Sequence, residues 1–439
     1  MLKVVKFGGS SLASGTQFEK VKNIVSADEA RTVVVVSAPG KRFSQDNKIT
    51  DLLYICHAHL KYNVSCDDIF DKIRERYIAI KNECGLTTDI ESELDDISAK
   101  FTKNTPVDFI VSRGEYLCAR LMAEYLGYDF IDSAEWLYFD YDGHIDFEKT
   151  NSKLSELFTV HKKIVIPGFY GVLPDGQIKV FSRGGSDITG SVAAAALNAD
   201  CYENWTDVPG ILMADPSIVK NPRPIQQITF EELRELSYMG AQVLHEDAVF
   251  PIRHKNIPLY IKNTNDINAE GTLIMDSIKG DGDDKHSKFI TGISGKKNYT
   301  LITIGKANLS ENIGYIRHAL EIAERFGLAP EHMPSSVDRF SLLFVSEKLT
   351  GCLHELMSQL TQELSPDTIS VTKDLALVAV VGRRMAYHFG TSGRLFSALG
   401  KDGINIRMIE QGADEISIIV GVENAEFEHA IRVLYDSFT

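Results

Sequence analysis

Short apolar runs alternate with amphipathic stretches over roughly the first 280 residues of the chain. Residues 2–7 and Thr32–Ser37 are rich in β-branched residues, and Phe18–Ser26 between them carries apolar residues at helical spacing. Lys163–Pro167 and Tyr202–Trp205 repeat the strand pattern further along. Continuous apolar strands separated by helices are typical of a parallel sheet covered on both faces. The pattern therefore predicts an α/β fold with a mainly parallel sheet sandwiched by helices.

Other segments of this region show different patterns. Ile49 to about Lys103 is helical and rich in charge, which predicts a helical cover or lid beside the sheet, after a polar, mobile loop at Lys41–Lys48. Val107–Ser112 predicts a further strand, followed by a helix through Leu126. Gly171–Val180 predicts a hairpin around a Pro-Asp-Gly turn.

The last third of the chain differs in kind. Two segments there, beginning near Leu301 and Ala376, share an order of strands and helices, with about 60–70 residues in each copy. A polar, Gly- and Asp-rich stretch, Lys279–Lys288, precedes them. We therefore expect a domain boundary near residue 285 and a pair of small α+β domains after it.

Composition narrows the possible classes of function. A chain of 439 residues predicts two or three domains, and 46 basic against 61 acidic residues disfavour a nucleic-acid or anionic-membrane surface. No apolar run approaches the ~18 residues of a membrane span, and the start of the chain does not resemble a signal peptide, so we expect a cytoplasmic protein. The six cysteines lack ligand spacing, which predicts reduced, mostly buried thiols and no metal site.

Two glycine-rich stretches could bind phosphate. In Lys6–Ser11 an apolar strand breaks at Gly8 and Gly9, which let backbone N–H groups approach a phosphate beside the charge of Lys6. The alternative is a hairpin turn with an exposed lysine. In Ser182–Asp187, three residues can point N–H donors at an anion where a helix begins. Ligands of an open parallel sheet bind beyond the carboxyl ends of its strands, so we expect these loops to converge.

Several polar side chains near these loops have alternative roles. Arg183 can bind a carboxylate through two hydrogen bonds, and Asp187 is either a helix N-cap or a carboxylate that organises a lysine or a magnesium ion. Glu115 is either a first-turn acid favoured by the helix dipole or an acceptor for a substrate ammonium group. Thr50 is either a helix cap or a donor to a substrate carboxylate, and Thr206–Gly210 could hold a nucleoside.

Taken together, these motifs resemble the aspartate kinases of the amino-acid kinase superfamily. Lys6–Ser11, Arg113–Glu115, Ser182–Asp187, Thr206–Gly210 and a Gly-Ala-x-Val-Leu-His segment at Gly240–His245 appear in family order. The tail resembles the paired ACT domains of aspartokinases, so the likeness covers nearly the whole chain. It implies an amino-acid-kinase-type sheet sandwiched by helices, plus two α+β ferredoxin-like ACT domains.

The resemblance also implies an activity. A monofunctional aspartate kinase transfers the γ-phosphate of ATP, bound with Mg²⁺, to the β-carboxylate of L-aspartate, the first step towards lysine, threonine and methionine. Carried over by position, the implied catalytic residues are Lys6 and Asp187. The implied aspartate-binding residues are Ser37, Thr50, Glu115 and Arg183. The implied ATP-binding residues are Lys6, Gly8, Gly9, Ser10, Gly185, Ser186, Thr206 and Asp207.

In the tail, His332–Asp338 resembles the effector loop of a first ACT domain, although a Pro-Ser turn with an Asx cap explains it equally simply. The resemblance implies feedback by lysine, with threonine as a second candidate, and a homodimer or homotetramer formed through ACT domains. The implied effector-binding residues are Asn312, Gly314, Ser336 and Asp338. The implied domains are a kinase domain at 1–280, a linker at 281–288, a first ACT domain at 299–373 and a second at 289–298 and 374–439.

Some positions depart from the family pattern, and two rival functions stay open. Leu212, Ser217 and Gln242 replace residues common on the nucleotide side of the family, which leaves the adenine contacts undefined. One rival is a kinase for another small acid or nucleotide, such as glutamate or uridylate. The other is an amino-acid sensor that has kept the kinase fold without catalysis; retention of Lys6 and Asp187 argues against it.

Overall fold

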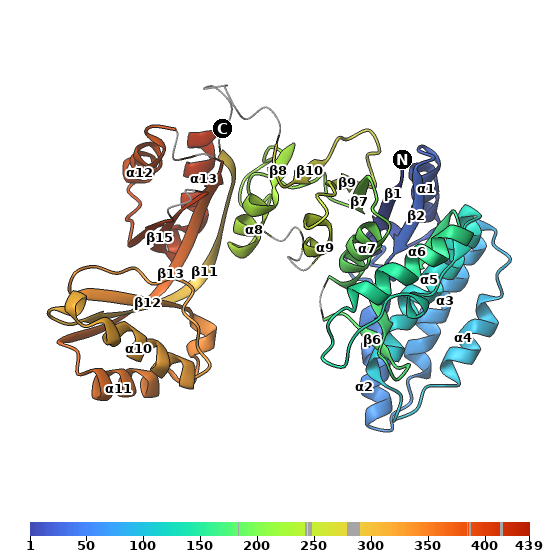
Figure 1. Cartoon of the computed structure of the whole chain (residues 1–439), viewed down its shortest axis with the longest axis horizontal. Helices are drawn as coiled ribbons and strands as arrows, with labels where there is room; N and C mark the ends of the chain where they lie inside the picture. Colours follow the sequence, from blue (N-terminus) through green and yellow to red (C-terminus); the bar gives the residue numbers. More distant parts are fainter. Residues whose placement is uncertain are drawn as a thin grey trace. The chain divides into compact units, whose positions relative to one another are not determined.

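The computed structural model describes residues 1–182, 184–241, 244, 248–278, 290–383, 385, 388–412 and 416–439 (Figure 1). The expected linker at 281–288 lies outside these residues. The described residues fall into two units. The first contains residues 1–211 and 224–230 with the described residues between 242 and 282, and the second contains residues 212–223 and 231–241 with the tail.

An eight-stranded sheet organises the first unit. Its strand order is β3-β4-β2-β1-β7-β9-β10-β8, and every neighbouring pair except β9 and β10 is parallel. The strands are β1 (Lys3–Phe7), β2 (Arg31–Val36), β3 (Asp129–Phe130), β4 (Ile164–Pro167), β7 (Cys201–Thr206), β8 (Gln227–Thr229), β9 (Leu259–Asn263) and β10 (Thr272–Met275). The mainly parallel sheet is thus confirmed, and the hairpin is present as β5 (Tyr170–Val172) paired with β6 (Ile178–Val180).

Helices cover the two faces of this sheet. They are α1 (Gly15–Ser26), α2 (Ile49–Lys61), α3 (Asp67–Cys84), α4 (Ile90–Ser98), α5 (Val107–Leu126), α6 (Phe147–Val160), α7 (Gly185–Ala196) and α9 (Phe250–Arg253). Val5 and Phe7 of β1 pack into one apolar cluster with α1–α5. Side chains of a strand alternate between faces, so Lys6 lies on the opposite face, where α7 packs against β1 and β7 (Figure 1).

The strand predicted at Val107–Ser112 is wrong, because these residues form the first two turns of α5. Val107, Ile110 and Val111 are spaced to share one face of a helix, and a six-residue apolar run does not distinguish a strand from a buried helix. As a consequence, Glu115 lies in the middle of a 20-residue helix instead of its first turn.

The second unit is built on a five-stranded antiparallel sheet with the order β12-β11-β13-β15-β14. Its elements are α8 (Phe230–Tyr238), β11 (Ile290–Gly305), α10 (Ile313–Arg325), β12 (Arg339–Val345), α11 (Leu353–Leu364), β13 (Thr368–Gly382), α12 (Thr391–Lys401), β14 (Met408–Gln411), β15 (Ser417–Glu423) and α13 (Phe427–Phe438). The long strands β11 and β13 run through both halves of the sheet (Figure 1). Helices α10 and α11 pack on the β12 half, and α13 packs on β11 and β13.

Two expectations from composition can also be compared with the structure. All six cysteines are free thiols, and four of them are buried, as predicted. Among the described residues, no helix combines the length and the apolar character needed to cross a membrane.

Candidate active site

The buried Lys6 forms an ion pair with the partly exposed Asp187 where β1 meets the first turn of α7. Lys6 Nζ lies 2.6 Å from Asp187 Oδ1, and the whole Lys6 residue is 7% exposed. This excludes the exposed lysine of a hairpin turn. Asp187 does not cap the helix, because the N-cap is Gly184. The role of Asp187 as an organiser of a lysine is the interpretation that fits this geometry.

The turn after β1 lies against the turn after β2. Gly40 N–H donates to the carbonyl of Gly9 at 2.7 Å, and a Cβ on Gly9 would approach the Ala38 carbonyl to 2.7 Å. Gly8 N–H donates to the carbonyl of Trp205 in β7. Gly9 is therefore required by close contact between backbones, and these contacts bring the ends of three strands together.

The start of α7 reaches the same edge of the sheet. Gly184 adopts a left-handed conformation with φ of 59°, which glycine tolerates without strain, and the helix begins at Gly185. Gly168, just beyond β4, packs against Ser186, and its N–H donates to the Val36 carbonyl of β2. Arg183 lies outside the described residues.

Glu115 of α5 is a buried carboxylic acid. It is 4% exposed, and among the described residues no hydrogen bond reaches its Oε2 atom. Burial raises the pKa of Glu115 to about 8, although the Ala38 N–H and the Arg113 charge oppose the shift. The Ala38 contact ties Glu115 to the turn that packs on Gly9.

Of the remaining predicted residues of this unit, Ser37, Thr206 and Ser10 lie at or just after the carboxyl ends of strands, and Thr50 lies at the start of a helix. Ser37 follows β2 and donates its N–H to the Phe7 carbonyl, and Thr50 lies in the first turn of α2. Thr206 ends β7, and its hydroxyl donates to Asp207 at 3.2 Å. Ser10 lies in a short 3₁₀ helix after β1. The expected convergence of these loops thus follows from the order of the parallel strands.

Two features of the site were missed by the sequence analysis. Asn204, beside Lys6 in the sheet, hydrogen-bonds both Lys6 and Asp187. The loop before α2 is held in place, because the buried Arg76 of α3 donates to both Gly40 and Asp46. The ion pairs with Arg42 and Arg76 hold the pKa of Asp46 well below its usual range. Only a polar residue inside a buried strand could have signalled Asn204.

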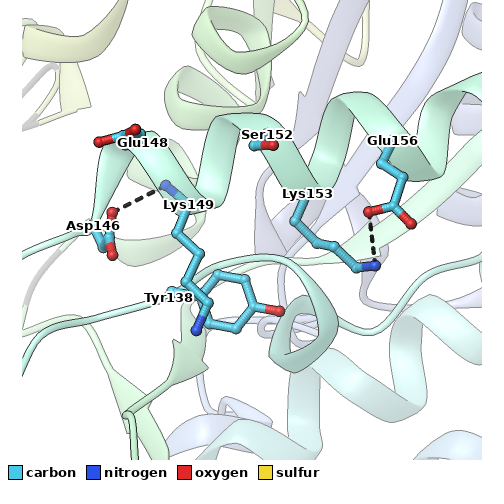
Figure 2. Close-up of a pocket in the computed structure, with 7 residues that line it drawn as sticks. All are labelled: Tyr138, Asp146, Glu148, Lys149, Ser152, Lys153 and Glu156. Carbon is cyan, nitrogen blue, oxygen red and sulfur yellow. Dashed lines mark hydrogen bonds and ion pairs between the residues drawn. The ribbon is translucent and has the colours of Figure 1, made fainter.

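A surface pocket of about 370 Å³ lies elsewhere, on α6 (Figure 2). Its lining residues are Tyr138, Asp146, Glu148, Lys149, Ser152, Lys153 and Glu156. Lys153 pairs with Glu156, and the Lys149 ammonium lies over the Tyr138 ring at 3.8 Å (Figure 2). None of these residues belongs to the cluster around Lys6, so we do not assign the active site to this pocket.

Of the predicted effector residues, Asn312 and Gly314 lie at the start of α10, and Asp338 is bonded to the loop before it, whereas Ser336 lies in the turn before β12. Asp338 accepts a hydrogen bond from the Asn308 N–H at 3.0 Å, and Asn312 is the N-cap of α10, directly before the helix. Gly314 lies in the first turn, and Ser336 donates its N–H to the Arg339 carbonyl. A pocket of about 260 Å³ in the same unit contains none of these four residues and lies instead at the start of α12, beside Thr391 and Ser392.

The sequence of this chain matches two known protein families. Residues 1–263 match the model of the amino acid kinase family, and residues 378–438 match that of the ACT domain. Aspartokinase 3 of Bacillus subtilis is 37% identical over an alignment that covers 100% of this chain and 98% of that protein. The chain belongs to the aspartate kinase family.

Solved structures of the same family agree with this assignment. The aspartate kinase of Clostridium acetobutylicum is 46% identical, with a TM-score of 0.90 and full coverage of both chains. The aspartokinase III of E. coli, solved with aspartate and ADP, is 25% identical, with a TM-score of 0.77, and the match covers 100% of this chain and 99% of that one. The family fold thus extends over the kinase and the ACT regions of this chain.

We predict that Gly9→Ala destabilises the first unit, because its methyl group would clash with the backbone of Ala38 and Gly40. Overpacking of this kind costs about 1–3 kcal/mol. Both tryptophans, Trp136 and Trp205, are buried in the first unit, so denaturant unfolding followed by tryptophan fluorescence reports on that unit. The matched control is Gly8→Ala, whose Cβ would make only ordinary contacts at 3.6 Å. Equal stability of the two variants would contradict the close approach at Gly9.

Proposed function

We propose that this protein transfers the γ-phosphoryl group of Mg·ATP to the side-chain carboxylate of L-aspartate and forms 4-phospho-L-aspartate. This reaction would be the cytoplasmic first step towards lysine, threonine and methionine. The observation that carries the proposal is the ion pair between the buried Lys6 of β1 and Asp187 in the first turn of α7. It is supported by the E. coli relative solved with aspartate and ADP.

The reaction needs charge neutralisation and positioning more than proton transfer. The aspartate carboxylate is already a nucleophile, so no general base is required. Magnesium bound to ATP offsets part of the phosphate charge. In our proposal Lys6 faces the transferring phosphoryl group, and the N–H groups of Gly9, Gly185 and Ser186 hold phosphate oxygens near the positive end of the α7 dipole. The Gly8 N–H is already bonded to the Trp205 carbonyl, so Gly8 would contribute only room for the close approach of a phosphate.

Recognition of aspartate would use two charged groups. In our proposal Arg183 binds the α-carboxylate, with Ser37 and Thr50 as hydroxyl donors, and Glu115 accepts the α-ammonium group. The buried Oε2 of Glu115 supports this role, because an unpaired carboxylate in the interior is costly until a cation reaches it. Thr206 and Asp207 would contact the nucleotide.

The proposal is tested by ADP release from Mg·ATP with L-aspartate, L-glutamate and uridylate as acceptors. Turnover that depends on L-aspartate alone is the expected result. Turnover with glutamate or uridylate would favour a kinase for another acceptor. Absence of turnover with every acceptor would favour the amino-acid sensor.

We predict that L-aspartate binding releases a proton below pH 8. The ammonium group of aspartate stabilises ionised Glu115, whose pKa in the free protein is about 8, so the group must lose its proton on binding. The affinity for aspartate should therefore rise about tenfold per pH unit as the pH approaches 8, and then level off. Calorimetry in buffers of different ionisation enthalpy counts the released protons.

Glu115→Gln should weaken aspartate binding by about ten- to a hundredfold and abolish the proton release. The matched control is Glu124→Gln on the same helix. Glu124 is hydrogen-bonded to Thr87 and Thr88, so this variant should leave the aspartate affinity and the proton release unchanged. Proton release that persists in Glu115→Gln would exclude Glu115 from the ammonium site.

We also propose that L-lysine, with threonine as a second candidate, inhibits the enzyme through the ACT region, in a homodimer or homotetramer. The proposed site is the start of α10 with Asn312, Gly314, Ser336 and Asp338. The E. coli relative solved with lysine and aspartate supports lysine as the effector. An amino-acid carboxylate can bind at a helix start by the same logic as phosphate.

Asp338→Ala should relieve inhibition by L-lysine at least about tenfold, because its carboxylate holds the loop before α10 and would be available to an effector ammonium group. The measurement is the half-inhibitory lysine concentration in the ADP-release assay. Ser392→Ala, in the pocket at α12, is the control and should leave inhibition unchanged. Relief by the control but not by Asp338→Ala would move the effector site away from α10.

A further inference from the structure

Asn204 is the side chain in the sheet that contacts both members of the Lys6–Asp187 pair. It lies on β7 directly beside Lys6 in the register of β1 and β7, and it is 4% exposed. Its Nδ2 donates to Asp187 Oδ1 at 2.8 Å, and its Oδ1 accepts from Lys6 Nζ at 3.4 Å. The amide orientation is determined by these partners, because only Nδ2 can donate to a carboxylate.

The three side chains form a closed ring of hydrogen bonds. Asp187 Oδ1 accepts hydrogen bonds from both Lys6 Nζ and Asn204 Nδ2, so this carboxylate oxygen has two donors inside the ring. Within the part of the chain that the structure describes, no hydrogen bond or ion pair reaches Asp187 Oδ2. The amide thus fixes the rotation of the Asp187 carboxylate, and it gives the Lys6 ammonium a second acceptor.

We propose that Asn204 is a positioning residue for phosphoryl transfer. It holds the Lys6 ammonium and the Asp187 carboxylate in one orientation, so that a phosphate group meets a preset charge and little reorganisation is needed during transfer. This inference rests on the proposed kinase activity. Asn204 would act through Lys6 and Asp187 and would contact neither ATP nor aspartate.

The proposal predicts an effect on turnover and little effect on substrate binding. Asn204→Leu keeps the size of the side chain and removes both hydrogen bonds. Its kcat should fall about ten- to a hundredfold, with KM values for ATP and aspartate within about twofold of wild type. The matched control is Tyr202→Phe on the same face of β7, whose hydroxyl bonds the Asp187 backbone carbonyl and not the carboxylate, and its kcat should stay within about twofold.

A second variant covers the case in which Asn204→Leu does not fold. Asn204→Asp places a second carboxyl group against Asp187, opposite the Lys6 ammonium and near the Tyr202 hydroxyl. Two adjacent carboxylates share a proton at low pH, when the protonated group can donate as the amide does, and repel each other once both ionise. Its kcat relative to wild type should therefore rise as the pH falls.

Tryptophan fluorescence gives the folded fraction by which each kcat is corrected. Corrected kcat values of Asn204→Leu near wild type, or a pH profile of Asn204→Asp parallel to wild type, would overturn the role of Asn204. Absence of aspartate-dependent turnover in the wild-type protein would instead refute the kinase activity, so the two failures are distinguishable.

Discussion

The catalytic unit depends on one electrostatic constraint, the burial of a lysine ammonium group inside a sheet. A buried charge is tolerated only when it is paired and hydrogen-bonded. Lys6 therefore requires Asp187 from α7 and Asn204 from β7, and this in turn requires that β1 and β7 be neighbours with α7 across their face. The strand order of the sheet thus supplies the partners that make the lysine possible.

The glycines around this pair serve the same constraint. Gly9 allows the turns after β1 and β2 to touch, and Gly184 allows α7 to begin where its first turn meets Lys6. The start of α7 and the Lys6 ammonium group thus lie at the same edge of the sheet as the turns after β1 and β2. Such an edge favours a phosphate because its donors are already oriented and need little rearrangement.

Sequence patterns predicted the mainly parallel sheet and the repeated α+β order of the tail because buried strands and amphipathic helices repeat with different periods. Val107–Ser112 was misassigned because six apolar residues suit either element, and Glu115 was consequently placed at a helix start when it lies mid-helix. The role of Asn204 could not be predicted from local patterns, because its partner Lys6 is 198 residues away along the chain. Only the folded sheet brings these two side chains into contact. Likewise the packing of Gly9 on Gly40 depends on strand order, which local patterns do not contain.

The central claim is that Lys6 acts on the transferring phosphoryl group and not merely on ATP binding. Single-turnover phosphoryl transfer, followed by rapid quench with saturating Mg·ATP and L-aspartate, measures this step directly. We predict that Lys6→Met slows this step by about a hundredfold or more. Lys3→Met, a substitution on the same strand as Lys6, breaks the ion pairs of Lys3 with Asp28 and Glu203 and should not slow it. An unchanged single-turnover rate in Lys6→Met, with only ATP affinity reduced, would contradict the account.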